Sequence, residues 1–302
     1  MRNFHEVVDQ AMLRPEVAGL RPMVEKEILH YAILHGLDRE GLLDNLIFQG
    51  GTAIRMCYGG QRGSEDLDFC GGRGFAPAQL REIQSCMKSF IGGQYGIEIE
   101  VKNPKQMREV PSYFGLQIDR WQLSFITSPQ QKHLPRQRIK FEVANIPSYD
   151  VELHALRKNH AEVGDGYEDT LVRVESMSEI MSDKVVALAA STEHVRHRDI
   201  WDLLWLKQRG AEPRPDLIRR KIDDYEIVDY QRKLDDRISD LHGIVRSRGF
   251  IDEMGRFLVP AVRTRTLDRE GFLDYMSDQV AAIMDHTRRK LYKPEPEFEF
   301  EI

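Results

Sequence analysis

The sequence contains little of what marks secreted or membrane-spanning proteins. Its 302 residues include only three cysteines, Cys57, Cys70 and Cys86, an odd number without the spacing of zinc ligands. No apolar run approaches the ~20 residues that a transmembrane helix needs. The N-terminus carries acidic residues early and lacks the apolar core of a signal peptide. We therefore expect a cytoplasmic protein without membrane contact, whose cysteines are reduced thiols in or near a core.

Positive charge is not in excess either. The 43 Lys and Arg residues are outnumbered by 49 Asp and Glu residues, which gives a formal net charge of −6. This balance argues against a protein that coats nucleic acid by bulk electrostatics. The densest basic stretch, residues 132–140, is typical of a solvated strand edge but also of a local basic groove. The Glu- and Pro-rich tail at 293–301 is typical of a frayed end, although its alternating Phe residues also fit an edge strand added to a partner.

The periodicity of apolar residues divides the chain into two parts. In the first part we expect helical spacing at 4–35, helices at 52–58 and 77–90, and strands at 42–48, 67–70, 97–101, 116–126 and 138–146. In the second part we expect helices at 176–190, 197–209, 231–246 and 273–292. The sequence thus predicts an α+β core with a mixed or antiparallel sheet at residues 1–165, followed by a helical C-terminal domain at 166–302.

A glycine pair follows a short apolar run near residue 50. Leu46-Ile47-Phe48 precedes Gly50-Gly51-Thr52, an order typical of a strand, a tight turn and a helix start. Glycines let backbone N–H groups approach a phosphate closely, and a helix N-terminus favours negative charge. By itself such a segment is more often an ordinary turn, so its meaning depends on the residues that follow.

Two aspartates follow soon after. Asp66 and Asp68 alternate with Leu67 and Phe69, so on a strand both carboxylates would project from the same face. Like-charge repulsion makes this arrangement costly unless a divalent cation is bound, and Mg²⁺ prefers a couple of carboxylates together with substrate phosphates. The pattern predicts a metal site, with a solvated loop pair as the alternative.

A two-metal site would need a third carboxylate from a neighbouring strand. Glu142 is the candidate, because it points away from the core together with Lys140 in an alternating strand, although the pattern alone also fits an ordinary exposed glutamate. Asp150, just beyond this strand, is the fallback. Ser64 could offer its hydroxyl to a terminal phosphate, or could merely cap a loop.

Charged residues also recur in the helical part. Lys184 has apolar neighbours on the first expected helix, which is typical of a surface lysine whose stem covers apolar area. On the next helix Asp199 and Asp202 are three residues apart and share a face. The simplest interpretation is a surface ion pair between Asp202 and Arg198, worth roughly 0.3–0.5 kcal/mol.

Together these motifs resemble the AbiEii/AbiGii toxin family, a branch of the nucleotidyltransferases with a polymerase-beta-like core. The resemblance begins with Gly50-Gly51-Thr52-Ala53-Ile54-Arg55 and continues with Arg62-x-Ser64-x-Asp66-x-Asp68-Phe69. Lys184, and then Arg198-Asp199-Ile200-Trp201-Asp202-Leu203, match the third and fourth motifs of that family. The four motifs cover about residues 45–205. One departure is that the third acid is Glu rather than Asp.

The resemblance implies a metal-dependent nucleotidyltransferase that is the toxin of a toxin–antitoxin pair. It would transfer NMP from NTP–Mg²⁺ (or Mn²⁺) to an acceptor hydroxyl, for which family members suggest an RNA, especially a tRNA 3′ end. A cognate antitoxin would be its protein partner. Two alternatives stay open: transfer to a small hydroxyl compound such as an antibiotic, and a non-catalytic module that binds NTP or a partner.

The resemblance also assigns roles to residues. The metal ligands would be Asp66, Asp68 and Glu142. The catalytic residues would be these three together with Lys184 and Asp199. The helical domain would complete the nucleotide cleft, and the nucleotide-binding residues would be Gly50, Gly51, Thr52, Arg55, Ser64, Lys184 and Asp202.

Overall fold

The computed structural model describes residues 3–104, 112–113, 116–127, 136–164 and 166–292. The chain divides into two compact units: the first comprises Met1–Ser176 with Arg256–Thr264, and the second comprises Met177–Gly255 with Arg265–Ile302. The tail at 293–301 and the beginning of the basic stretch, 132–135, lie outside the described residues. None of the described helices combines the length and the apolarity required to cross a membrane.

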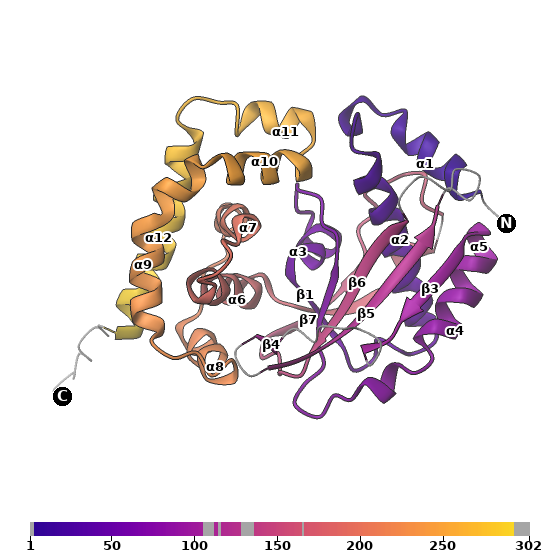
Figure 1. Cartoon of the computed structure of the whole chain (residues 1–302), viewed down its shortest axis with the longest axis horizontal. Coiled ribbons are helices and arrows are strands. Elements are labelled where there is room, and N and C mark those ends of the chain that lie inside the picture. The colour runs from indigo at the N-terminus through magenta and orange to yellow at the C-terminus, as the bar shows by residue number, and fades with distance from the viewer. Residues whose placement is uncertain (1–2, 105–111, 114–115, 128–135, 165, 293–302) are drawn as a thin grey trace, which may run out of the picture. The chain divides into compact units, whose positions relative to one another are not determined.

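The first unit is built on a mixed β-sheet (Figure 1). Its strands are β1 (Ile47–Gln49), β2 (Leu67–Cys70), β3 (Glu98–Lys102), β4 (Ser112–Tyr113), β5 (Leu116–Ile126), β6 (Gln137–Ala144), β7 (Val151–Ala155) and β8 (Leu171–Glu175). The order is β3-β5-β6-β2-β1-β8-β7, and β4 pairs with β5. Because β2 runs antiparallel to β1 but parallel to β6, two strands that are distant in the sequence lie side by side.

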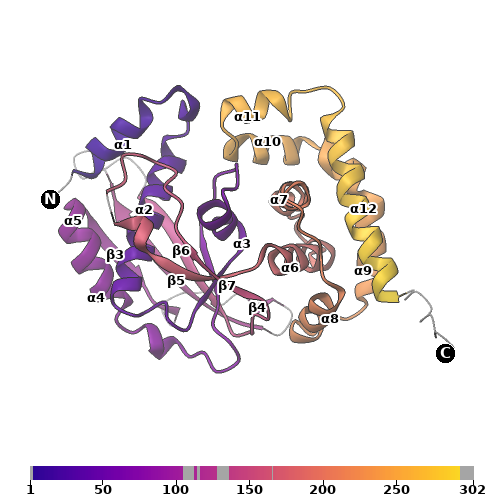
Figure 2. The same ribbon diagram turned by 180° about the vertical axis from the view of Figure 1, so that it is seen from behind.

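Helices precede and interrupt these strands (Figures 1 and 2). They are α1 (Phe4–Met12), α2 (Arg21–Arg39), α3 (Gly50–Ala53), α4 (Ile83–Met87) and α5 (Gly93–Tyr95), with 3₁₀ turns at Pro15–Val17, Pro77–Leu80 and Tyr167–Asp169 and π-helical turns η2 (Ile54–Tyr58) and η4 (Lys88–Gly92). Pro22 lies in the first turn of α2, where a missing N–H costs nothing. α2 packs on β6, and α4 packs on β3.

The two faces of the sheet differ in polarity, because side chains alternate along each strand. On one face the rings of Phe48, Phe69 and Phe141 stack, with centroids 5.0 and 4.8 Å apart, and each is at most 1% exposed. The three cysteines are buried thiols as well, and burial raises the pKa of Cys57 to about 12 and that of Cys86 to about 11. The opposite face carries polar side chains, and the candidate site lies on it.

Of the five predicted strands, β2 and β5 have the expected bounds, 67–70 and 116–126. The ends of β3 and β6 differ from the predicted 97–101 and 138–146 by one or two residues. The strand predicted at 42–48 is wrong over residues 42–46, since β1 begins only at Ile47. α2 extends to Arg39, and the hydrogen-bonded turns after it occupy the intervening residues.

The predicted helix ends in the first unit also need correction. The helix expected at 52–58 already begins at Gly50, but it ends at Tyr58 as predicted, where Gly59 follows with a φ of +81° that suits glycine. The helix expected at 77–90 starts as a 3₁₀ turn and continues through Gly92 to Tyr95. Glycines ended the predicted helix too early because they weaken a helix without forbidding it.

The second unit is helical, as predicted. Its helices are α6 (Met177–Ala190), α7 (His197–Gln208), α8 (Pro215–Asp224), α9 (Tyr230–Arg246) and α12 (Phe272–Tyr292), and α10 (Arg248–Phe257) leads out of it toward α11 (Pro260–Arg265). α6 packs against α7, α8 and α9, while α12 packs against α9 and α7. α6, α7, α9 and α12 were predicted, whereas the shorter helices α8, α10 and α11 were not.

Candidate active site

A row of polar side chains crosses four strands on the polar face of the sheet. Gln49 of β1 lies opposite Asp68 of β2, and Asp68 lies opposite Glu142 of β6. Glu142 in turn lies opposite Arg120 of β5. Residues opposite each other in paired strands point to the same face. Asp68 and Glu142, which the sequence analysis assigns to one metal site, are therefore neighbours on the sheet.

Asp66 lies two residues before Asp68, where β6 and α3 hold it. Its Oδ1 accepts a hydrogen bond from the backbone N–H of Lys140 at 3.1 Å, and the ammonium of Lys140 lies 3.9 Å from its Oδ2. The carbonyl of Asp66 accepts a hydrogen bond from the hydroxyl of Thr52. Because 29% of its side chain stays exposed, the Asp66 carboxylate is fixed in position but open to a ligand.

The loop that carries Asp66 is anchored on α2. Lys26 donates to the carboxylate of Glu65 at 2.6 Å, and Nε2 of His30 donates to the carbonyl of Glu65 at 3.1 Å. Burial lowers the pKa of His30 to about 4, so its ring is neutral near pH 7. His30 thus supports the acidic loop without adding a positive charge to it.

Glu142 is paired with a cation from the next strand. Nε of Arg120 donates to Oε1 of Glu142 at 2.5 Å, and the two side chains are only 16% and 18% exposed. The alternative third acid, Asp150, lies before β7, and its Oδ2 accepts the hydroxyl of Ser176 at 2.7 Å. Since β1 and β8 separate β7 from β2, Glu142 is the acid that the fold places beside Asp68.

Both glycines of the pair face site residues. Gly50 has a φ of +77°, and a Cβ added to it would lie 3.0 Å from Oδ2 of Asp68. A Cβ added to Gly51 would lie 3.1 Å from Oγ of Ser64 and would overlap the guanidinium of Arg62. Gly50 is therefore required for its backbone conformation, whereas a side chain at Gly51 would displace the guanidinium of Arg62.

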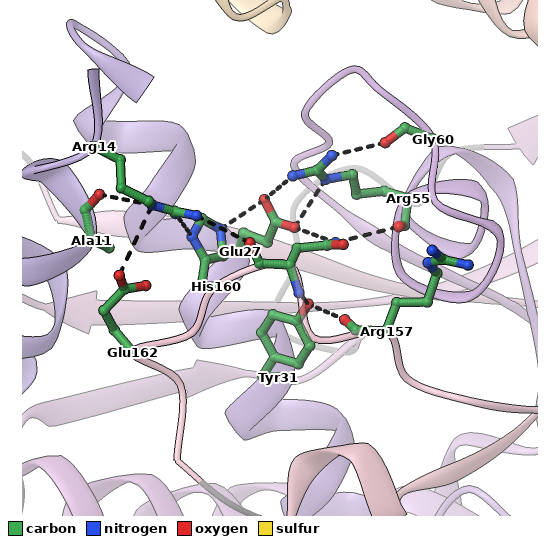
Figure 3. Close-up of polar contacts among 10 residues, drawn as sticks. Ala11, Arg14, Glu27, Tyr31, Arg55, Gly60, Arg157, His160 and Glu162 are labelled. Atoms are coloured by element: carbon green, nitrogen blue, oxygen red, sulfur yellow. Dashed lines mark hydrogen bonds and ion pairs between the residues drawn. The ribbon is translucent and has the colours of Figure 1, made fainter. Parts of the chain in front are cut away.

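Arg55 is engaged by protein groups. Its guanidinium donates to both carboxylate oxygens of Glu27, at 2.9 and 3.2 Å, and to the carbonyl of Gly60 at 2.8 Å (Figure 3). Burial by itself would raise the pKa of Glu27, but Arg55 and then His160 lower it well below its usual range. This geometry favours a structural role for Arg55, which ties η2 to α2, and the predicted contact of Arg55 with nucleotide stays a prediction.

His160 completes the buried network around Glu27. The guanidinium of Arg14 donates to its Nδ1, so the proton of a neutral ring belongs on Nε2, 3.1 Å from Oε2 of Glu27 (Figure 3). Asn159 donates to Oε1 of Glu27 at 2.7 Å. One local signal for this network was Glu27, a charged residue inside the apolar stretch that forms α2, whereas nothing local indicated Arg14 or His160.

In the second unit, Lys184 is held by both aspartates of the fourth motif. Its ammonium lies 2.7 Å from Oδ1 of Asp199 and 2.7 Å from Oδ2 of Asp202, and all three side chains are at most 8% exposed. Burial by itself would raise the pKa of Asp199, but Arg196 and then Lys184 lower it well below its usual range. The structure thus brings these three predicted residues together as one buried cluster.

The expectation of surface residues on α6 and α7 was wrong. Lys184 is 7% exposed and Asp202 is 2% exposed. Nε of Arg198 lies 3.4 Å from Oε1 of Glu253. Because α7 is buried on almost every side, the spacing of its aspartates could not show which face is exposed to solvent.

A second buried lysine was missed entirely. Lys221 of α8 is fully buried and binds Glu179 at 2.9 Å and Asp183 at 3.0 Å, both on α6. α6 therefore contributes a lysine to the acids of α7 and two acids to the lysine of α8. A lysine within the amphipathic pattern of α8 gave no local sign of burial.

The carboxylates of the first unit fit a divalent cation. Asp66, Asp68 and Glu142 offer oxygen ligands on one face, which is the donor set that Mg²⁺ and Mn²⁺ prefer. Arg120 would have to share or release Glu142 when a cation binds. In the second unit, by contrast, Asp199 and Asp202 already have the ammonium of Lys184 as their counter-charge.

The chain is similar to one protein family and to solved structures. Residues 32–298 match the family described as nucleotidyl transferase AbiEii toxin, type IV TA system. Among curated proteins none matches. JHP933 from Helicobacter pylori is 19% identical, with a TM-score of 0.43 over 89% of this chain and 93% of that one. Another H. pylori structure, described as a candidate nucleotidyltransferase, is 20% identical, with a TM-score of 0.47 over 89% and 98%.

The family match covers most of the chain and includes every motif residue discussed above. It extends from α2 through both units. The α+β architecture with a helical C-terminal region agrees with the predicted fold class. The chain therefore belongs to the AbiEii family of nucleotidyl transferase toxins of type IV toxin–antitoxin systems.

Proposed function

We propose that this toxin transfers NMP from an NTP to the 3′-hydroxyl of an RNA, with a tRNA as the first acceptor to test. The family supplies the general reaction, nucleotidyl transfer, and implies an antitoxin and an NTP substrate. One observation carries the assignment of the site: the register of β2 and β6 sets Asp68 opposite Glu142, with Asp66 two residues away.

The proposed reaction breaks the bond between the α- and β-phosphates. The acceptor hydroxyl attacks the α-phosphorus, its proton passes to a site carboxylate or to water, and pyrophosphate leaves. A divalent cation held by Asp66, Asp68 and Glu142 would neutralise phosphate charge and lower the pKa of the attacking hydroxyl. The hydroxyl of Ser64, beside Gly51, could donate to a phosphate oxygen.

The second unit is proposed to complete the nucleotide cleft through Lys184, Asp199 and Asp202. The family resemblance is the basis for this role, and the ion pairs suggest how it works. Two aspartates keep the ammonium of Lys184 in a single position. A phosphate could replace one of them as its partner, so that the positive charge is already in place when the nucleotide binds.

Basic side chains beside the acids support RNA as the acceptor. Arg138 and Lys140 alternate with apolar residues on β6, so they lie on the face of Glu142, and both are exposed. A polyanion that crosses β6 would meet these charges next to the carboxylate row. Binding of a small hydroxyl compound would not require these two basic side chains.

Incubation with each of the four labelled NTPs, Mg²⁺ and total RNA tests this function. We expect wild type to label an RNA band and Asp68→Asn to label none. Glu100→Gln, which removes an exposed carboxylate from the same face, should behave like wild type. Label in a small molecule would favour the antibiotic-type acceptor, and NTP binding without transfer would favour the non-catalytic module.

A further inference from the structure

Arg62 is a buried arginine on the loop between η2 and β2. Only 5% of the surface of Arg62 is exposed. One terminal nitrogen of its guanidinium donates to the carbonyl of Gly63 at 2.9 Å. The backbone around it is clamped by a segment from much later in the chain: Arg62 bridges Leu258, and the N–H of Gly63 donates to the carbonyl of Phe257 at 2.8 Å. These contacts fix the backbone of Arg62, and the carbonyl of Gly63 holds its guanidinium.

The guanidinium lies directly against the glycine pair. A Cβ on Gly51 would be 3.1 Å from Cζ of Arg62 and closer still to a terminal nitrogen. The same Cβ would be 3.1 Å from the hydroxyl oxygen of Ser64. A guanidinium and a hydroxyl thus converge on the one backbone position from which a side chain is missing.

The charge balance of the site calls for a cation at this place. Asp66, Asp68 and Glu142 are acids, and Glu142 already has Arg120 as its partner. A nucleoside triphosphate brings about four further negative charges, which divalent cations at the carboxylates offset only in part. A planar guanidinium is suited to two phosphate oxygens at once.

We propose that Arg62 binds the terminal phosphates of the NTP, beside Gly51 and Ser64. This inference rests on the proposed function and deepens it, because it names the group that distinguishes a triphosphate from a monophosphate. Arg62 binds the terminal phosphates, whereas Asp66 and Asp68 act on the reacting α-phosphate through the cation that they would hold. A larger side chain at position 51 would displace the guanidinium from the place where it would contact the phosphate.

The test is a series of equilibrium binding measurements with tri-, di- and monophosphates of the four ribonucleosides, in Ca²⁺. The proteins are wild type, Arg62→Met, Arg62→Lys and a matched control, Arg81→Met, which removes an exposed arginine of the same unit. We expect Arg62→Met to weaken triphosphate binding roughly 10- to 100-fold, the loss typical of a charged hydrogen-bond partner, and to leave monophosphate binding nearly unchanged. Arg62→Lys should recover part of the loss, and Arg81→Met should bind like wild type.

Other outcomes separate this inference from the proposed function. If wild type prefers the triphosphate and folded Arg62→Met keeps the same preference, Arg62 does not bind the phosphates. An equal loss for tri- and monophosphate would likewise mean a structural role. No preference for the triphosphate in wild type would instead overturn the proposed NTP site. Should Arg62→Met fail to fold, Gly51→Ala displaces the same guanidinium and must show the same selective loss.

Discussion

Asp68 and Glu142 lie directly opposite each other on the parallel strands β2 and β6, although β3, β4 and β5 separate them in the sequence. We predict that Asp68→Asn and Glu142→Gln each reduce the initial rate of nucleotidyl transfer by orders of magnitude, because each removes a ligand of the proposed cation. The melting temperature of Asp68→Asn should stay near that of wild type. Near-normal labelling by either folded variant would contradict the assignment.

Arg120 competes with a cation for Glu142. We expect Arg120→Gln to tighten Mn²⁺ binding several-fold, because the variant removes a positive charge 2.5 Å from a ligand oxygen. Glu142→Gln should weaken Mn²⁺ binding. Electron paramagnetic resonance of free Mn²⁺ during titration measures both effects. Unchanged affinity in both variants would show that Glu142 is not a ligand.

The network around Glu27 makes stability depend on pH. Because Arg55 and His160 hold the pKa of Glu27 well below its ordinary value of 4.5, the ionised carboxylate contributes stability above that pH, and this contribution is lost as the pH falls below it. Glu27→Gln should lower the free energy of unfolding by about 3–5 kcal/mol at neutral pH, since it leaves a buried partner charge uncompensated.

Urea unfolding at a series of pH values measures this effect. The gap between wild type and Glu27→Gln should narrow as the pH falls from about 5 toward 3. Glu6→Gln, on the exposed side of α1, is the control and should show little difference from wild type at any pH. A gap of constant size would mean that the ionisation of Glu27 is not responsible.

Lys184 has both a structural and a proposed catalytic role, and these can be separated. Lys184→Met alone removes the buried ammonium between Asp199 and Asp202 and leaves Asp199 only Arg196, so we expect about 3–5 kcal/mol of destabilisation. Adding Asp199→Asn and Asp202→Asn should recover much of that loss. Recovered stability with absent transfer would support a role at the nucleotide, whereas recovered activity would leave Lys184 a structural residue.

Toxicity should depend on the carboxylates. Expressed in bacteria without an antitoxin, wild type should slow growth and Asp66→Ala should not, because blocking an essential RNA end stops translation. Growth curves at matched protein levels, checked by immunoblot, decide this. Inhibition that persists in Asp66→Ala would point to aggregation or binding as its cause.

Site residues that are close together in the sequence could be predicted from the local pattern alone. β2 alternates over four residues, so the polar face of Asp68 could be predicted directly, whereas Asp66 lies just before the strand. Glu142 was harder, because its pattern fits any exposed strand and only strand register brings it to Asp68. The family resemblance, not the alternation, singled it out.

Burial of charge was the main failure of sequence reasoning. Lys184, Asp202 and Arg55 each look like surface residues in a helical pattern, and each is satisfied by a partner on another helix. A buried ion pair has no signature in either partner alone, because its stability depends on geometry that only the fold supplies. Lys221 shows the same limit.

The clamp of Phe257 and Leu258 on the Arg62 loop has a consequence for synthesis. A ribosome releases the chain from its N-terminus, so the glycine pair and both aspartates emerge long before the residues that fix the loop beside them. The first unit therefore cannot reach its final arrangement until nearly the whole polypeptide has left the exit tunnel. The loop that precedes both aspartates thus gains its last backbone contacts only near the end of synthesis.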